Sequence, residues 1–89
     1  MNKDVNFLLN DYFKILNIIY NNQITINDET YCNLSQNEIA ILNGTARATV
    51  NIALNKLKDM DLIQYDIKQQ KKYYLTQRAL DILNIINRI

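Results

Sequence analysis

Residues 45–60 carry side chains suited to bind a partner through hydrogen bonds and charge. If this segment is a helix, a rotation of about 100° per residue places Arg47, Asn51 and Asn55 together on its outer face. An arginine supplies several N–H donors and a positive charge, and an asparagine amide supplies both a donor and an acceptor. This combination favours recognition of a polar partner over the making and breaking of covalent bonds.

The residue types that most catalytic and metal sites require are scarce. The chain has no histidine, one cysteine (Cys32) and one glycine (Gly44). It therefore lacks the commonest general base and metal ligand, a zinc-binding set and a glycine-rich phosphate loop. We expect no enzymatic activity, no cofactor and no metal. Cys32 is expected to be a small, half-buried hydrophobic residue, with an intermolecular disulfide as the alternative.

Charge is distributed unevenly along a chain whose net charge is only +1. Residues 1–44 contain two lysines against five acidic residues, a net charge of −3, whereas residues 45–89 contain eight basic and four acidic residues, a net charge of +4. The positive charge lies in the same half as the polar segment, where a phosphate backbone could be bound.

The 89 residues predict a single domain spanning 1–89. Apolar residues at helical spacing predict a first helix over 5–21, with a stripe through Leu16 and Ile19 and further apolar residues, Ile15 among them, off that stripe. Residues 23–34 are expected to be a connector with a turn at 27–29 and a short strand over 31–34.

Two consecutive helices are predicted over about 35–60. Ser35 and Glu38 have the spacing of a capping box, and Gly44 can take the left-handed conformation that ends a helix. The second helix begins near residue 45 or 46 and buries Val50, Leu54 and Leu57. Two helices joined by a short turn that contains glycine are typical of a helix-turn-helix.

A hairpin and a last helix complete the predicted elements. Strands are expected over 63–67 and 72–75 around a polar tip at 68–71, and Thr76 caps a helix that runs to about residue 88. The first and last helices carry more apolar surface than one small core needs, which predicts a homodimer formed through them. No apolar run approaches the roughly 18 residues of a membrane span, so we expect a cytoplasmic protein without membrane contact.

Four short motifs resemble those of the winged helix-turn-helix superfamily, and most of all the MarR-type bacterial DNA-binding regulators. They lie in the family's order and spacing, and comprise Ser35, Glu38, Ile39 and Ala40; Gly44, Arg47, Thr49 and Val50; Leu54, Leu57, Leu62 and Ile63; and Tyr73, Leu75 and Thr76. The resemblance implies a mainly α fold with a small β-hairpin wing over 63–75, in which a three-helix core is followed by a terminal helix over 76–88.

The chain departs from the family's pattern at four positions. Ala46 replaces the usual capping serine, so Thr45 is expected to cap the helix one residue early. Asp61 and Ala79 replace glycines, and Ile52 stands where a basic residue is frequent.

The resemblance also implies how DNA would be bound. Helix 45–60 would enter the major groove, and the wing over 63–75 would meet the backbone or the minor groove. The implied contacts divide into base edges, thymine methyl groups and phosphates. The candidate residues are Thr45, Arg47, Ala48, Thr49, Asn51, Ile52, Asn55, Lys68, Lys71 and Lys72.

Three functions remain open on the sequence. The first is a small, homodimeric transcriptional regulator that binds duplex DNA. The second is a replication or mobile-element accessory factor that binds duplex or single-stranded DNA, which agrees with a composition typical of A+T-rich genomes. The third is a winged helix that serves as a protein-interaction module.

Overall fold

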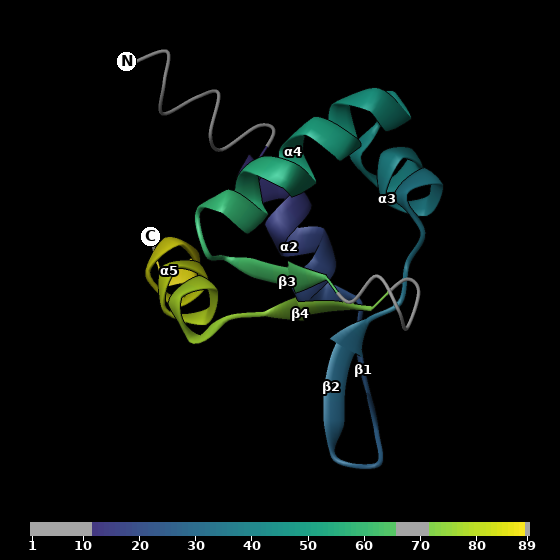
Figure 1. Cartoon of the computed structure of the whole chain (residues 1–89). Helices are drawn as coiled ribbons and strands as arrows, with labels where there is room; N and C mark the ends of the chain where they lie inside the picture. The colour runs from purple at the N-terminus through teal and green to yellow at the C-terminus, as the bar shows by residue number, and fades with distance from the viewer. Residues whose placement is uncertain (1–11, 66–71, 89) are drawn as a thin grey trace.

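A computed structural model describes residues 12–65 and 72–88, which form four helices and a four-stranded antiparallel sheet (Figure 1). The fold is therefore mixed α/β. In chain order the elements are α2 (Phe13–Asn21), β1 (Gln23–Ile26), β2 (Glu29–Cys32), α3 (Gln36–Asn43), α4 (Arg47–Asp59), β3 (Ile63–Tyr65), β4 (Tyr73–Leu75) and α5 (Gln77–Arg88).

Helix α2 lies at the centre of the molecule and contacts α3, α4 and β4. The expected apolar stripe is confirmed at Leu16 and Ile19, which are fully buried. Ile15, which lies off that stripe, is fully buried as well, because α2 is covered from several sides rather than one. The predicted segment 5–11 of this helix lies outside the described residues.

The segment predicted as a connector, 23–34, forms a β-hairpin instead. Strands β1 and β2 pair from Gln23↔Cys32 to Ile26↔Glu29. The strand expected over 31–34 therefore exists, but it begins and ends two residues earlier, as β2. Asn27 and Asp28 make the turn with φ angles of 52° and 66°. A two-residue hairpin turn of type I′ needs positive φ at both positions, and Asn and Asp tolerate this conformation better than most residues.

The sheet combines this β1–β2 hairpin with the β3–β4 hairpin, which was predicted over 63–75. The strand order is β1-β2-β4-β3, with β2 bonded to β4 at Cys32↔Tyr73. Strands β3 and β4 pair with Ile63 opposite Leu75, as the predicted hairpin requires. The expected two-stranded wing is thus half of a larger sheet, and its tip at 68–71 lies outside the described residues. The β1–β2 hairpin projects away from the helices (Figure 1).

Local capping rules fix helix α3 and the turn after it. The capping box is confirmed, since Ser35 Oγ accepts from the Glu38 N–H at 3.1 Å and Glu38 Oε1 accepts from the Ser35 N–H at 2.9 Å. Gly44 ends α3 in the left-handed conformation, with φ of 70°. A short turn therefore leads directly into α4.

The start of α4 differs from the expectation. Ala46 is the N-cap residue and makes no side-chain capping bond, so the predicted cap at Thr45 is wrong. Because α4 begins at Arg47, the Thr45 side chain stands one residue too early, and its hydroxyl accepts from Asn43 Nδ2 at 3.1 Å instead.

The core is closed by α4, α5 and the sheet. The predicted buried face of α4 is confirmed at Val50, Leu54 and Leu57. Cys32 is fully buried rather than half-buried, and burial raises the pKa of its thiol. This location shields the thiol from the partner that an intermolecular disulfide would need.

Thr76 joins the start of α5 to the turn after α4. Its hydroxyl accepts from the Ala79 N–H at 3.2 Å, which confirms the predicted cap, and donates to the Asp61 carbonyl at 2.7 Å. Asp61 takes a positive φ of 58° in that turn. Among the helices described here, none has the length and apolar character that crossing a bilayer demands.

Candidate nucleic-acid interface

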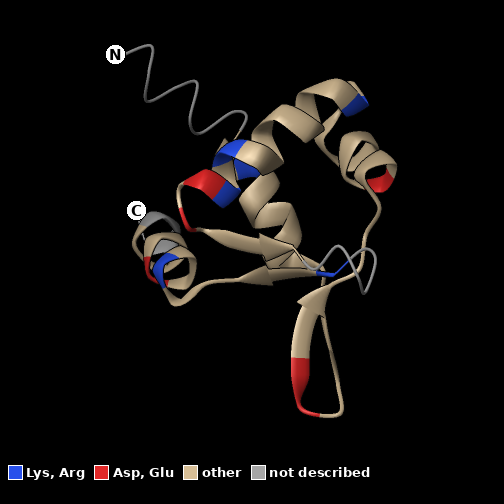
Figure 2. Cartoon of the chain, in the orientation of Figure 1, with Lys and Arg blue, Asp and Glu red and all other residues tan. Residues whose placement is uncertain are grey.

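Helix α4 presents most of the predicted binding residues to solvent. Its buried residues occupy one face, and the opposite face carries exposed side chains: Arg47, Ala48, Asn51, Ile52 and Asn55. Thr45 and Thr49 are half-buried. Lysines and arginines lie toward both ends of this helix, and acidic residues lie at its C-terminal end as well as in the turn of the β1–β2 hairpin (Figure 2). The structure therefore brings the predicted α4 residues together on one surface.

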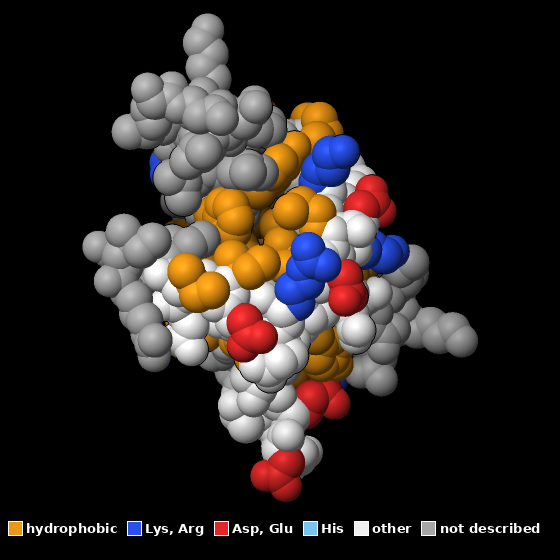
Figure 3. Space-filling model, turned by 90° about the vertical axis from the view of Figure 1, so that its left-hand side faces the viewer, with side chains coloured by type: hydrophobic (Ala, Val, Ile, Leu, Met, Phe, Trp, Pro, Cys, Tyr) orange, Lys and Arg blue, Asp and Glu red, His pale blue; other side chains and the backbone are white. Residues whose placement is uncertain are grey.

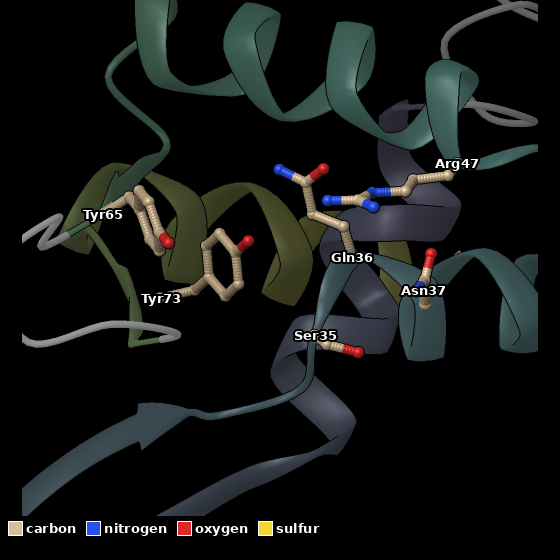
Figure 4. A pocket seen from close by; sticks show the side chains of 6 residues that line it. All are labelled: Ser35, Gln36, Asn37, Arg47, Tyr65 and Tyr73. Atoms are coloured by element: carbon tan, nitrogen blue, oxygen red, sulfur yellow. The ribbon is translucent and has the colours of Figure 1, made fainter.

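Two cavities with shared walls lie where α3, α4 and the β3–β4 strands meet. One has a volume of about 280 Å³, and its lining residues are Ser35, Gln36, Asn37, Arg47, Tyr65 and Tyr73 (Figure 4). The other has a volume of about 210 Å³, and its lining residues are Gln36, Asn51, Leu54, Asn55, Lys58, Ile63, Tyr65 and Tyr73. The amide and basic groups of α4 thus border a hollow that a partner's surface could enter.

A tyrosine pair forms the floor that both cavities share. Tyr65 and Tyr73 stack with ring centroids 4.7 Å apart and an interplanar angle of 19°. Tyr73 is 3% exposed, and this burial raises the pKa of its phenol. The neighbouring Tyr65 adds to the rise, whereas the polar amide of Gln36 and the charge of Arg47 act against it. The phenol therefore stays protonated at neutral pH as a fixed polar group beneath α4.

A chain of amide hydrogen bonds runs along the border of the cavities. Asn55 Nδ2 donates to Asn51 Oδ1 at 3.3 Å, and Asn51 Nδ2 donates to Gln36 Oε1 at 3.4 Å. Gln36 and Tyr73 both line the two cavities. Figure 4 shows the Gln36 amide beside the guanidinium of Arg47, between the tyrosines and α4.

Gln36 is a candidate that the sequence prediction missed. It is the first residue of α3, immediately after the capping Ser35. A polar side chain at the start of the first helix of a predicted helix pair was the available signal. Its contact with α4 spans fifteen residues, so helical periodicity within α4 did not reveal it.

Lys72 belongs to a different polar cluster. Its Nζ lies 3.1 Å from Glu29 Oε1 and 4.5 Å from the centroid of the Tyr31 ring. The Tyr74 hydroxyl donates to the same carboxylate at 2.8 Å. The hydrogen bonds from Tyr74 and then from Lys72 lower the pKa of Glu29, and the bond to Glu29 raises the pKa of Lys72. This cation is thus already paired with the β1–β2 hairpin.

Two of the predicted site residues, Lys68 and Lys71, lie outside the described residues. Within the described part, no three histidine, cysteine or acidic side chains are grouped as a metal site would require. No family model, curated protein or solved structure matches this chain.

Proposed function

We propose that the chain is a winged helix-turn-helix protein that binds duplex DNA, as a small transcriptional regulator. In this proposal α3 and α4 are the helix-turn-helix, α4 enters the major groove, and the β3–β4 hairpin is the wing that lies on the backbone or the minor groove.

One observation carries the proposal. The outward face of α4 groups Arg47 and the amides of Asn51 and Asn55 at the border of a hollow, and none of the described residues that line this hollow is acidic. Arginine can bind phosphate or guanine, and asparagine can pair with adenine through a donor and an acceptor. Ala48 and Ile52, both exposed beside them, supply apolar contacts for thymine methyl groups.

Fluorescence anisotropy of labelled duplex and single-stranded DNA tests this function. The proposal predicts binding of the duplex that weakens steeply as salt rises toward about 0.2 M, because bound lysines and arginines release counterions from the DNA. A preference for single strands would favour the replication or mobile-element function instead. An absence of binding to either form at low salt would contradict DNA binding altogether.

A second candidate function is a protein-interaction module. Its support is the exposure of large apolar side chains on the helix pair, since Ile41 is 78% exposed, Leu42 57% and Ile52 64%. Replacing Ile41 and Leu42 with serine separates the two functions. DNA binding that persists in this variant favours the nucleic-acid function. If the wild type binds DNA negligibly and the variant loses a protein that co-purifies with the wild type, the module is favoured instead.

The proposal includes a homodimer that uses the first and last helices. On α5, Ile82 is half-buried and Ile85 is 63% exposed, and Phe13 at the start of α2 is half-buried. Hydrophobic side chains gather on the face of the molecule where α5 lies (Figure 3). A two-fold dimer would place two α4 helices on successive turns of a palindromic site. Light scattering of an Ile85→Glu variant is expected to give the monomer mass, and a wild-type monomer would contradict the dimer.

A further inference from the structure

We propose that Gln36 is a positioning residue that sets the base preference of Asn51. This inference rests on the proposed function, because it concerns how the exposed face of α4 distinguishes one base pair from another. It assigns a role to a residue of α3 that contributes nothing to the buried face of α4.

The first step concerns the orientation of the Gln36 amide. Its Oε1 accepts from Asn51 Nδ2 at 3.4 Å. The amide lies beside the guanidinium of Arg47, between the tyrosines and α4 (Figure 4). Gln36 and Tyr73 line the same two cavities, and Tyr73 is itself immobilised by burial and by its stacking on Tyr65. The bond from Asn51 therefore favours the orientation in which the oxygen of the Gln36 amide faces α4.

The second step transfers that orientation to α4. Because Gln36 Oε1 faces Asn51, the Asn51 amide directs its nitrogen toward Gln36 and its oxygen toward Asn55. An asparagine amide has two N–H donors and two acceptor positions, so Asn51 keeps one of each for a partner. A donor and an acceptor held in a fixed order match adenine, which presents an acceptor and a donor in the major groove, and not guanine, which presents two acceptors.

The test uses the duplex that the wild-type protein selects from a randomised library, and variants of it with single base pairs exchanged. Gln36→Met keeps the length of the side chain but removes its hydrogen bonds. The expected result is a roughly three- to tenfold loss of discrimination between A·T and G·C at one position, the effect of one lost exposed hydrogen bond. Affinity for a scrambled duplex should stay unchanged. In an Asn51→Ala background, Gln36→Met should cause no further loss of discrimination, because the two residues act together.

Gln77→Met is the matched control, since Gln77 is also the first residue of its helix, on α5. Unchanged discrimination in Gln36→Met, or an equal loss of affinity on every duplex, would overturn the positioning role alone. Failure of the wild type to select any duplex would overturn the proposed function and this inference with it.

Discussion

The two faces of α4 differ in what surrounds them and, under the proposed function, in what they do. The inner face is in the core, where Val50, Ala53, Leu54 and Leu57 are each at most 5% exposed. The outer face carries Arg47, Asn51 and Asn55 in solvent, held by long hydrogen bonds between exposed amides. Packing of the inner face therefore fixes where α4 lies, and the outer side chains are not needed to hold the helix in place. Substitutions on the two faces should have separable effects.

The largest expected effect is on the inner face. Leu57→Ala should lower the free energy of unfolding by about 2–5 kcal/mol, because Leu57 is fully buried and its truncation leaves a cavity. Urea denaturation measures this change. Ile52→Ala, on the outer face, is the control and should change stability by no more than about 0.5 kcal/mol. Equal losses from the two substitutions would contradict the separation of the faces.

The next effect is on binding. Arg47→Ala should cost about 1–3 kcal/mol of binding free energy on a selected duplex and leave the unfolding midpoint unchanged. Anisotropy titrations measure the first quantity and urea denaturation the second. Arg78→Ala removes an exposed arginine from α5 and should alter neither. If Arg47→Ala binds as tightly as the wild type, the assignment of α4 as the recognition helix is wrong.

A third substitution acts on the turn that sets α4 against α3. Gly44→Ala should lower the free energy of unfolding by about 1–2 kcal/mol, because φ is 70° at this residue and an L side chain is strained there. Among the described residues, no atom lies within 4 Å of the position of the added Cβ, so the loss comes from backbone conformation and not from a clash. Gly44→Asn should cost less, since asparagine tolerates the left-handed conformation. The same loss for both variants would point to a steric cause instead.

The smallest effect concerns the β1–β2 hairpin, which lies away from both faces. Hydrogen bonds from Tyr74 and then from Lys72 lower the pKa of Glu29. A carboxyl with a lowered pKa stabilises the fold above its ordinary pKa, and that contribution is lost as the pH falls through the lowered value. The carboxyl carbon shift of Glu29 should therefore titrate below the usual glutamate range, and in Lys72→Met its midpoint should move upward. A midpoint that does not move would show that the ion pair has no influence on Glu29.

Local rules made part of this structure predictable. The capping box at Ser35 and Glu38, the left-handed Gly44 and the buried face of α4 each depend on residues within a few positions of one another. The pairing of β2 with β4 depends on Cys32 meeting Tyr73, forty-one residues later, which local patterns do not reveal. The β1–β2 hairpin is local and was missed even so, although its turn at Asn27 and Asp28 lies within the predicted turn.

The candidate site, like the fold, was predictable in its local features and not in its long-range contacts. The exposed positions of Arg47, Asn51 and Asn55 followed from helical spacing alone. Their links to other elements did not, because the bond from Asn51 to Gln36 and the ion pair of Lys72 with Glu29 both join segments distant in the sequence. Such contacts are set by tertiary packing, which periodicity does not encode.

The proposal that the outer face of α4 is the surface that binds DNA is tested most directly by a nuclear magnetic resonance titration with a duplex. The amide signals of Arg47, Ala48 and Asn51, and the side-chain amides of Asn51 and Asn55, should shift first and furthest as DNA is added. Signals from the β1–β2 turn at Asn27–Asp28 should stay in place. Shifts confined to α5 or to that turn, with α4 unaffected, would contradict the account.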